Sequence, residues 1–206
     1  MGRTSNKQKS GSRGAAGQLR IIGGRLRGRK LAVADLPGLR PTTDRVRETL
    51  FNWLQFELPQ RRCLDLFAGT GALGLEALSR GASEVTLIER NATAAALLTE
   101  HTRALNDQCH GSATVAQADA LQWLTQAKMP PFDIVFVDPP FHSDLAAPAC
   151  ALLQQQQLIH SGSLIYLETE KEWPLKVPEN WRLEREKLAG QVCYRLFTVA
   201  AEEDLT

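Results

Sequence analysis

From residue 62 onward, apolar segments alternate with stretches that have helical periodicity. The segments "CLDLFAG", "EVTLIE", "ATVAQAD" and "FDIVFVDPP" have the character of strands, and the stretches between them predict helices over 72–79, 92–105 and 121–126. The run "IVFV" does not alternate with polar residues, which is typical of a strand buried on both faces of a parallel sheet. This order predicts an α/β fold whose crossover helices cover both faces of the sheet.

The last third of the chain predicts further strands. "SLIYLET" predicts a fifth strand. "WRLEREKLAGQVCYRLFTV" predicts two more around Ala189-Gly190, paired as an antiparallel hairpin that closes the sheet.

The first 60 residues follow a different pattern. Leu19–Ile22 and a second run through Leu31 and Val33 flank Gly23-Gly24, which predicts a hairpin with its turn at the two glycines. Thr42, Thr43 and Asp44 then offer N-caps for a helix with apolar positions at i, i+4, i+7 and i+8, namely Val46, Leu50, Trp53 and Leu54. We expect this helix to pack on the main domain.

Composition favours one main domain, because a chain of 206 residues with 43% apolar content can bury one substantial core. No apolar run approaches the ~20 residues needed to span a bilayer, and the first residues lack the apolar stretch of a signal peptide, so a cytoplasmic protein is expected. The four cysteines are far apart and form no Cys-x-x-Cys pair. We therefore expect neither a metal site nor a disulfide framework.

Charge is strongly segregated, although the formal net charge is only +1. Residues 1–62 carry 14 Lys+Arg and 4 Asp+Glu, whereas the remainder carries 10 and 19. Such segregation favours a basic appendage that binds a polyanion. The expected cations are Arg20, Arg25, Arg27, Arg29 and Lys30 in the hairpin and, with a weaker claim against an ordinary charged helix face, Arg45 and Arg47.

The segment "DLFAGTGALG" follows a strand and opens a helix. Gly69, Gly71 and Gly74 satisfy Gly-x-Gly-x-x-Gly, and Glu89 lies 20 residues after Gly69, so a nicotinamide-nucleotide site must be considered. The glycines alone do not discriminate between nucleotides. Asp65 does, because a carboxylate there would repel a pyrophosphate but would suit a ligand with a cationic ammonium. S-adenosylmethionine is such a ligand, and it carries no phosphate.

Two further acids close the next two predicted strands. Glu89 can accept from ribose hydroxyls, and Asp119 from the adenine amino group, with the backbone N–H of Ala120 available to a ring nitrogen. Each acid alone could equally be a helix N-cap. Together with Asp65, however, they stand at three successive strand ends in the order that S-adenosylmethionine requires.

The strand "IVFV" ends in "DPPF". Neither proline can donate to a strand ladder, so Asp138 and Phe141 are expected at the carboxyl end of the strand, where ligands bind in open α/β sheets. The Asp138 carboxylate and the Pro139 carbonyl could accept from the two hydrogens of an exocyclic amine, with Phe141 stacked on the base. His142 is either a proton acceptor or, as we expect, an ordinary surface histidine.

These motifs carry a family resemblance. "DLFAGTGALG", Glu89, Asp119 and "DPPF" resemble the Rossmann-like class I methyltransferases that act on exocyclic or amide nitrogens. With "RIIGGRLRGRKL" and "RPTTDRVRETLFNWL" included, the chain is similar over nearly its whole length to the bacterial 16S ribosomal RNA guanine-N2 methyltransferase family of RsmD type.

The resemblance implies a seven-stranded, mostly parallel sheet with an antiparallel C-terminal strand pair and a basic N-terminal extension. It implies an RNA-binding hairpin and helix over 19–60 and a methyltransferase domain over 61–206. Residues 1–18 are expected to be a disordered basic tail, because their Gly, Ser, Lys and Arg cannot build a core. The implied partner is 16S ribosomal RNA in a small subunit, with the protein monomeric. The implied catalytic residues are Asp138, Pro139 and Phe141, and the implied S-adenosylmethionine contacts are Asp65, Phe67, Gly69, Gly71, Glu89, Asp119 and Ala120.

Other functions remain open at this point. A nicotinamide-dependent oxidoreductase would leave "DPPF" and the basic arm without a role. An N6-adenine methyltransferase on DNA or RNA, or a protein glutamine methyltransferase, would share the "DPPF" chemistry. A non-catalytic RNA-binding module would keep the cations but would not need the three acids.

Overall fold

The computed structural model describes residues 17–34 and 43–201. The predicted tail over 1–18 lies outside the described residues except for Gly17 and Gln18, and so does the candidate cap Thr42. The elements, in chain order, are β1 (Gln18–Arg20), β2 (Lys30–Ala32), α1 (Asp44–Trp53), β3 (Arg62–Asp65), α2 (Gly74–Ser79), β4 (Glu84–Glu89), α3 (Ala92–Asn106), β5 (Ser112–Gln117), α4 (Ala120–Gln126), β6 (Phe132–Val137), α5 (Ala146–Gln155), β7 (Ile159–Glu170), β8 (Trp181–Ala189) and β9 (Val192–Val199).

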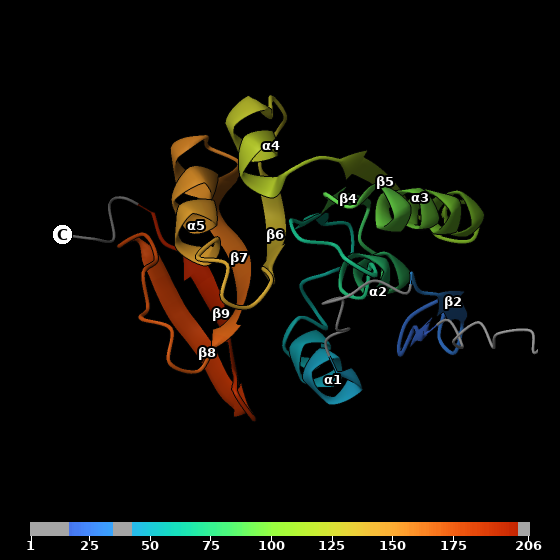
Figure 1. The fold of residues 1–206 in the computed structure, drawn as a ribbon, viewed down its shortest axis with the longest axis horizontal. Helices are drawn as coiled ribbons and strands as arrows, with labels where there is room; N and C mark the ends of the chain where they lie inside the picture. The colour runs from blue at the N-terminus through green and yellow to red at the C-terminus, as the bar shows by residue number, and fades with distance from the viewer. Residues whose placement is uncertain (1–16, 35–42, 202–206) are drawn as a thin grey trace, which may run out of the picture.

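One seven-stranded sheet organises the fold, in the order β5-β4-β3-β6-β7-β9-β8 (Figure 1). The pairs β3–β4, β3–β6, β4–β5 and β6–β7 are parallel, whereas β9 runs antiparallel to both β7 and β8. This confirms the predicted α/β class with its antiparallel C-terminal strands. The carboxyl ends of β3, β4, β5 and β6 therefore lie along a single edge of the sheet.

Helices cover both faces of this sheet, which explains why its central strands are apolar throughout. In one hydrophobic cluster, Phe51 and Leu50 of α1 pack with α2, α3 and alternate sheet residues such as Phe136. In the other, Leu124 of α4 and Leu153 of α5 pack with the intervening sheet residues. Every residue from Ile134 to Val137 is buried, because each side chain enters one of these two layers.

Some element boundaries differ from the sequence prediction. Helix α2 begins at Gly74, two residues later than expected, since the preceding residues form the glycine loop. Strand β7 runs well beyond "SLIYLET" at its start. Helix α5 was not predicted, and it has no side-chain cap at its N-terminus. Thr43 does cap α1, because its side chain accepts from the Val46 N–H.

The N-terminal hairpin exists, but its turn is not the predicted one. β1 and β2 pair with Leu19 opposite Leu31, and the connection between them spans residues 21–29. Gly23 and Gly24 dock on helix α2 instead. A Cβ added to Gly24, whose φ is +69°, would lie 2.0 Å from the Ser79 carbonyl oxygen. The two glycines therefore permit close approach of two backbones.

The hairpin is held to α2 by specific hydrogen bonds. The Ile22 N–H donates to Glu76 Oε2 (2.8 Å), the Leu26 N–H donates to Ser79 Oγ (2.9 Å), and Ser79 Oγ donates to the Gly23 carbonyl (2.6 Å). Figure 1 places this hairpin beside α2, at the opposite end of the molecule from the β8–β9 pair. The hairpin is thus a fixed part of the fold.

No helix within residues 17–34 and 43–201 is both long and apolar enough to cross a membrane.

Candidate active site at the carboxyl edge of the sheet

The four acids singled out in the sequence all lie at the carboxyl edge of the sheet. Asp65 and Glu89 are the last residues of β3 and β4, Asp119 caps the helix after β5, and Asp138 directly follows β6. These strands are adjacent and parallel. Backbone bonds continue beyond the strand ends, since the Ala68 N–H donates to the Ile88 carbonyl and the Ala118 N–H to the Glu89 carbonyl.

The glycine loop between β3 and α2 has a backbone conformation that residues with a side chain rarely adopt. Gly69 and Gly71 have φ values of +53° and +78°. A Cβ on Gly71 would come within 2.5 Å of Leu98 Cδ2 and within 2.8 Å of Leu75 Cδ1. The loop therefore exposes backbone to a ligand on one side while packing tightly on the other.

Asp65 is buried beneath this loop and holds it in place. Its Oδ2 accepts from the Gly74 N–H at 2.9 Å, and its side chain is 2% exposed. Burial raises the pKa of Asp65 to about 7, against the lowering effect of the Gly74 and Phe67 N–H groups and with a further upward contribution from the negative charge of Glu89. A cation above the loop would favour the ionised form of Asp65.

Glu89 ties the glycine loop to the end of β4. Its Oε2 accepts from the Gly69 N–H (2.8 Å) and its Oε1 from the Asn91 N–H (2.6 Å). A carboxylate oxygen has two lone pairs, so each retains acceptor capacity for a ribose hydroxyl. Asn91 in turn caps α3 through Oδ1.

Asp119 acts as an N-cap. Its Oδ1 accepts from the Leu121 and Gln122 N–H groups, both at 3.1 Å. This is the simpler of the two roles considered for this residue, and it is compatible with adenine recognition through Oδ2. Ala120 is the first residue of α4 and is buried, whereas Phe67 is half-buried against the second hydrophobic cluster.

The "DPPF" segment forms a loop between β6 and α5. Asp138 is half-buried, Pro139 is buried and the Phe141 ring is 44% exposed, so that the ring is open to a stacking partner. His142 and Asp144 have φ values of +58° and +51°, a conformation that is strained for residues other than glycine.

Glu170 at the end of β7 stabilises that strained loop. Its Oε1 accepts from the His142 N–H, and His142 Nδ1 lies 3.5 Å from the same oxygen. Glu170 also lines a hollow beside Pro139, Pro140 and Trp173. The position of His142 is thus explained by its backbone contact, and its ring is largely exposed.

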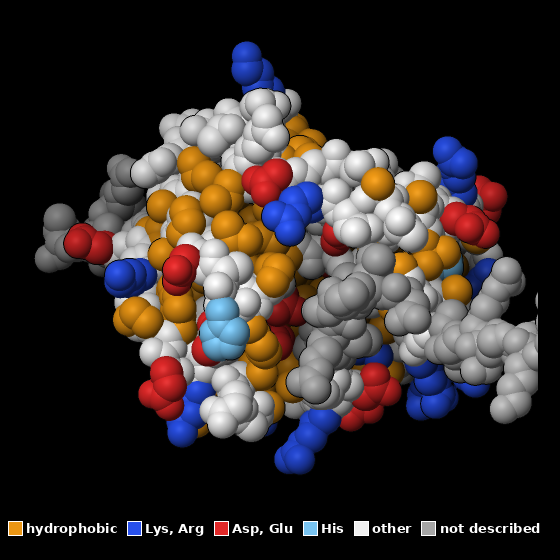
Figure 2. Space-filling model, in the orientation of Figure 1, with side chains coloured by type: hydrophobic (Ala, Val, Ile, Leu, Met, Phe, Trp, Pro, Cys, Tyr) orange, Lys and Arg blue, Asp and Glu red, His pale blue; other side chains and the backbone are white. Residues whose placement is uncertain are grey.

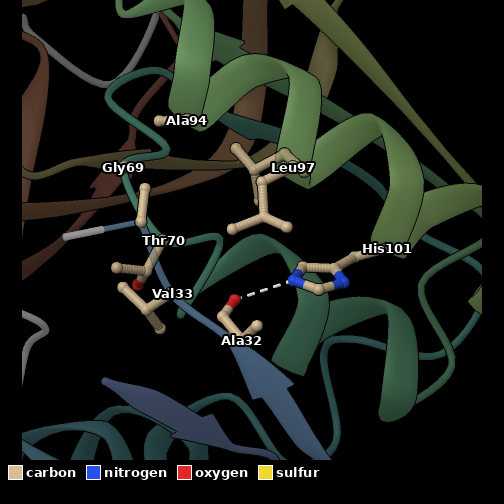
Figure 3. A pocket seen from close by; sticks show the side chains of 9 residues that line it. Ala32, Val33, Gly69, Thr70, Ala94, Leu97 and His101 are labelled. Carbon is tan, nitrogen blue, oxygen red and sulfur yellow. Dashed lines mark hydrogen bonds between the residues drawn. The ribbon is translucent and has the colours of Figure 1, made fainter. Parts of the chain in front are cut away.

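A second pocket lies between the hairpin, the glycine loop and α3 (Figure 3). Gly69 and Thr70 form one wall and Leu97 another, while His101 Nε2 lies 2.8 Å from the Ala32 carbonyl oxygen across the bottom of the pocket. The hairpin strand β2 therefore borders the loop that is expected to hold the donor.

Two polar residues of this edge were missed in the sequence. The Tyr166 hydroxyl donates to Glu168 Oε2 at 2.6 Å, and both side chains are buried. They lie in β7, the next strand of the sheet after β6. A partial signal for Glu168 was visible, because it is an acid near the end of the apolar run "SLIYLET", whereas Tyr166 within that run looks like a core residue.

Most of the expected RNA-binding cations lie at the surface. Arg29 is half-buried, and five are exposed: Arg20, Arg25, Arg27, Lys30 and Arg45. Arg25 and Arg29 reach the connection after α3, where Arg25 Nη1 lies 3.0 Å from His110 Nε2 and Arg29 Nη1 donates to Gln108 at 2.5 Å. On the face drawn in Figure 2, Lys and Arg side chains lie mainly at the rim, and hydrophobic side chains gather over the left half.

Arg47 corrects the sequence interpretation. Its side chain is 1% exposed, and its Nη2 donates to the Arg20 carbonyl (2.9 Å) and to Asp44 (2.6 Å). Nη1 lies 3.9 Å from Glu76, which is fully buried. Arg47 therefore belongs to the packing between α1, α2 and the hairpin and offers no surface to a phosphate. The helical pattern of the sequence could not reveal that Arg47 is buried, because a charged residue is normally assigned to the outer face of a helix.

Across the described residues, no group of His, Cys, Asp or Glu side chains is arranged to hold a metal ion. Cys63, Cys150 and Cys193 are buried and Cys109 is half-buried, all as free thiols. Burial raises the pKa of the Cys150 thiol to about 12, which leaves it unreactive as a nucleophile.

Comparison with known proteins now identifies the family. A family model described as conserved hypothetical protein 95 matches residues 19–198. The chain is 50% identical over 195 residues to ribosomal RNA small subunit methyltransferase D of Escherichia coli, covering 94% of this chain and 96% of that protein. It is 49% identical to the protein of the same name from Haemophilus influenzae, covering 89% and 95%.

Solved structures agree. The Escherichia coli protein yhhF superposes with a TM-score of 0.81 at 50% identity, covering 90% of this chain and all of the other. TrmN from Thermus thermophilus shares the fold, with a TM-score of 0.62 at 22% identity, covering 82% of this chain and 54% of TrmN. These matches confirm the resemblance seen in the sequence: the chain belongs to the ribosomal RNA small subunit methyltransferase D family.

Proposed function

We propose that this protein transfers a methyl group from S-adenosylmethionine to the exocyclic N2 of a specific guanine in 16S ribosomal RNA. One observation supports this above all others: Asp138 and Pro139 stand at the carboxyl end of β6, directly beside the strand that leads into the glycine loop. An acceptor pair for an amine and a cradle for a cationic donor thus share one edge of the sheet.

The residues suit the donor. Gly69 and Gly71 open the backbone of the loop to close approach, Glu89 offers acceptors at the next strand end, and the buried Asp65 gains from a positive charge above it. S-adenosylmethionine supplies an electrophilic methyl group on a sulfonium and becomes S-adenosylhomocysteine. The chain's own task is to align the target amine with that methyl group, which is the larger part of the expected rate enhancement.

Asp138 and Pro139 act on the amine. The lone pair of an exocyclic amine is delocalised into the base, which makes it a weak nucleophile. Two acceptors on its hydrogens draw the nitrogen toward a pyramidal, reactive form. Positive charge then builds on the nitrogen, and the Asp138 carboxylate stabilises that charge more in the transition state than in the ground state. The exposed Phe141 ring stacks on the base, which must be extruded or unpaired to reach it.

The substrate assignment rests on the named relatives and on the cations. The relatives act, by name, on small-subunit ribosomal RNA. Arg20, Arg27, Lys30 and Arg45 give this chain an exposed set of phosphate contacts within residues 19–60, next to a methyltransferase domain over 61–206. In this assignment the protein works in the cytoplasm as a monomer on an assembled or assembling subunit.

A direct assay tests this. Protein, labelled S-adenosylmethionine and small subunits lacking the modification are incubated, and the methylated nucleoside is identified by mass spectrometry. N2-methylguanosine at one position is the expected product. N6-methyladenosine as the product would overturn the substrate assignment. If calorimetry detected no binding of S-adenosylmethionine, the non-catalytic RNA-binding alternative would be supported.

Asp138 provides the sharpest variant. Asp138→Ala should lower turnover by about 10² or more, the scale expected for removal of a transition-state interaction, while donor affinity stays within a few-fold. Asp138→Asn, which keeps one acceptor oxygen but removes the charge, should fall between that variant and the wild type. If Asp138→Ala weakened donor affinity in the same proportion as turnover, Asp138 would belong to the donor site instead.

A further inference from the structure

The reactive amine does not stand alone on its base. On guanine, N2 is flanked by the ring N1–H, a donor that points in nearly the same direction as one of the amine hydrogens. On adenine or 2-aminopurine, N1 carries a lone pair and is an acceptor. A site that reads guanine therefore needs an acceptor for N1–H next to the acceptors for the amine, because an unpaired donor in a buried site costs free energy.

The sheet places one such acceptor beside Asp138. Strands β6 and β7 are parallel, with Phe136 opposite Tyr166 and Val137 opposite Leu167. The next residues along the two strands are Asp138 and Glu168. Side chains alternate along a strand, so Glu168 lies on the same face of β7 as Tyr166. Asp138 is the first residue beyond β6, at the position that continues the face of Phe136. The negative charges of Glu168 and Asp138 both raise the pKa of the Tyr166 hydroxyl, which indicates that both carboxylates lie near it.

Tyr166 fixes the orientation of Glu168. Its hydroxyl donates to Oε2 at 2.6 Å, and its ring lies 6.4 Å from the rings of Phe136 and Tyr194, with no exposed surface. Glu168 is itself only 6% exposed. Oε2 accepts from the tyrosine, and the carboxylate keeps acceptor capacity for the donor of a ligand. Such a carboxylate is held in place before the base arrives, which reduces the entropy cost of binding.

We propose that Glu168 is the guanine-specificity residue of this enzyme: its carboxylate accepts from N1–H while Asp138 and Pro139 accept from N2. The inference rests on the proposed function and extends it to base selection. An adenine in the same place would point the N1 lone pair at a carboxylate, and repulsion would exclude it. Tyr166 is a positioning residue that acts through Glu168.

The protonation state of Glu168 follows from its surroundings. Burial raises its pKa, and the hydrogen bond from Tyr166 opposes that rise. A carboxylate accepts only, whereas a protonated carboxyl could donate to N1 of adenine. The tyrosine therefore favours the form that selects guanine, and the N1–H of the correct base favours it further.

A base-analogue experiment tests the proposal. Once the methylated position has been mapped, small subunits are reconstituted with 16S RNA in two pieces, whose shorter, synthetic piece carries guanine or 2-aminopurine at that position. Both bases carry the N2 amine, but only guanine carries N1–H. For the wild type we expect kcat/KM to favour guanine by about 10² or more.

Glu168→Gln is the decisive variant, because its amide can donate to N1 of 2-aminopurine. We expect the preference for guanine to fall at least about tenfold, with donor affinity by calorimetry unchanged. Tyr166→Phe, which keeps the ring and removes only the hydroxyl, should lower the preference by a few-fold. An unchanged ratio in Glu168→Gln, or a loss of donor binding together with activity, would reduce Glu168 to a structural residue.

The two hypotheses fail differently. If the wild type forms no N2-methylguanosine in unmodified subunits, the proposed function fails before any variant is made. If it forms N2-methylguanosine and the analogue ratio does not depend on residue 168, only the present inference fails.

Discussion

Asp65 shows how one carboxylate can serve both the fold and the ligand. Its bond to the Gly74 N–H closes the glycine loop, and its burial makes the negative charge unfavourable in the absence of a cation. A bound ammonium removes that penalty. The buried negative charge of Asp65 therefore favours binding of a cationic ligand over binding of a pyrophosphate.

This preference has a pH dependence. Because the folded-state pKa of Asp65 is raised from 3.8 to about 7, the ionised form that attracts the donor is lost as the pH falls through 7. S-adenosylmethionine affinity should then fall by up to about tenfold for each pH unit below 7, since one pKa unit is ~1.4 kcal/mol. Calorimetry from pH 5 to pH 7 measures this.

Asp65→Asn is the matched control, since it keeps the acceptor oxygen for Gly74 and cannot ionise. Its affinity should be weaker than that of the wild type at pH 7 and nearly independent of pH below that. A wild-type profile as flat as that of the variant would show that Asp65 serves the loop alone.

At this scale the sequence predicted which residues gather but not what they contact. Asp65, Glu89, Asp119 and Asp138 all reached the expected edge, because each follows a strand of one parallel sheet. The capping bond of Asp119 and the burial of Asp65 depend on how the following loop turns, which residue order does not reveal. Tyr166 was hidden for the same reason, since a tyrosine in an apolar strand looks like core.

At the scale of elements, α2 links the hairpin to the carboxyl edge of the sheet through a buried ionic group. Glu76 accepts from the Ile22 N–H and from Arg80 at 2.7 Å, and it faces the buried guanidinium of Arg47. Within the described residues, Arg47 Nε and Nη1 have no hydrogen-bond partner, so the carboxylate of Glu76 is an important source of compensation for that buried charge.

Removing the carboxylate should therefore destabilise this packing. Glu76→Gln should lower the free energy of unfolding by about 3 kcal/mol, because it leaves a buried arginine less well compensated. Denaturant unfolding monitored by circular dichroism measures this. The double variant Glu76→Gln/Arg47→Met should recover part of the loss. Equal losses in the single and double variants would contradict the compensation.

The elements predicted best were those with a strong, simple period. β4 matched its prediction residue for residue, and α3 differed by one residue at its end. The sequence prediction misplaced the turn of the hairpin, because a Gly-Gly pair is typical both of tight turns and of close contacts between backbones. The close approach of the Ser79 backbone to Gly24, which shows that the second applies here, is seen only in the structure. Helix α5 combines a weak apolar face with a start that lacks a capping side chain.

At the scale of the whole molecule, the two ends of the described fold carry different patterns of charge. The exposed hairpin cations stand at one end of the molecule, beside α2. At the other end, edge strand β8 exposes every residue from Arg182 to Lys187, with acids and bases interspersed. Mixed charges on an edge strand discourage pairing with other chains, so the two ends have different surface roles.

The basic end should set the salt dependence of RNA binding. Replacing Arg27 and Lys30 with Gln should weaken binding and lower the slope of log affinity against log salt by about 0.7–0.9 for each phosphate that the protein no longer neutralises. Filter binding across a range of salt concentrations measures the slope. Lys128→Gln, which changes a cation between α4 and β6, is the control and should leave it unchanged. If the slope were also unchanged when Arg27 and Lys30 are replaced, these two residues would not contact RNA phosphates.

Helix α2 is only six residues long, and its two ends contact different segments of the chain. Its first residue donates to Asp65 beneath the glycine loop, and its last residue donates to the hairpin that is expected to face RNA. A shift of the hairpin upon RNA docking would therefore reach Gly74 through less than two helical turns. Linkage then requires a mutual effect: whatever factor RNA imposes on donor affinity, the donor must impose on RNA affinity. We therefore expect the affinity for each ligand to change when the other ligand is bound.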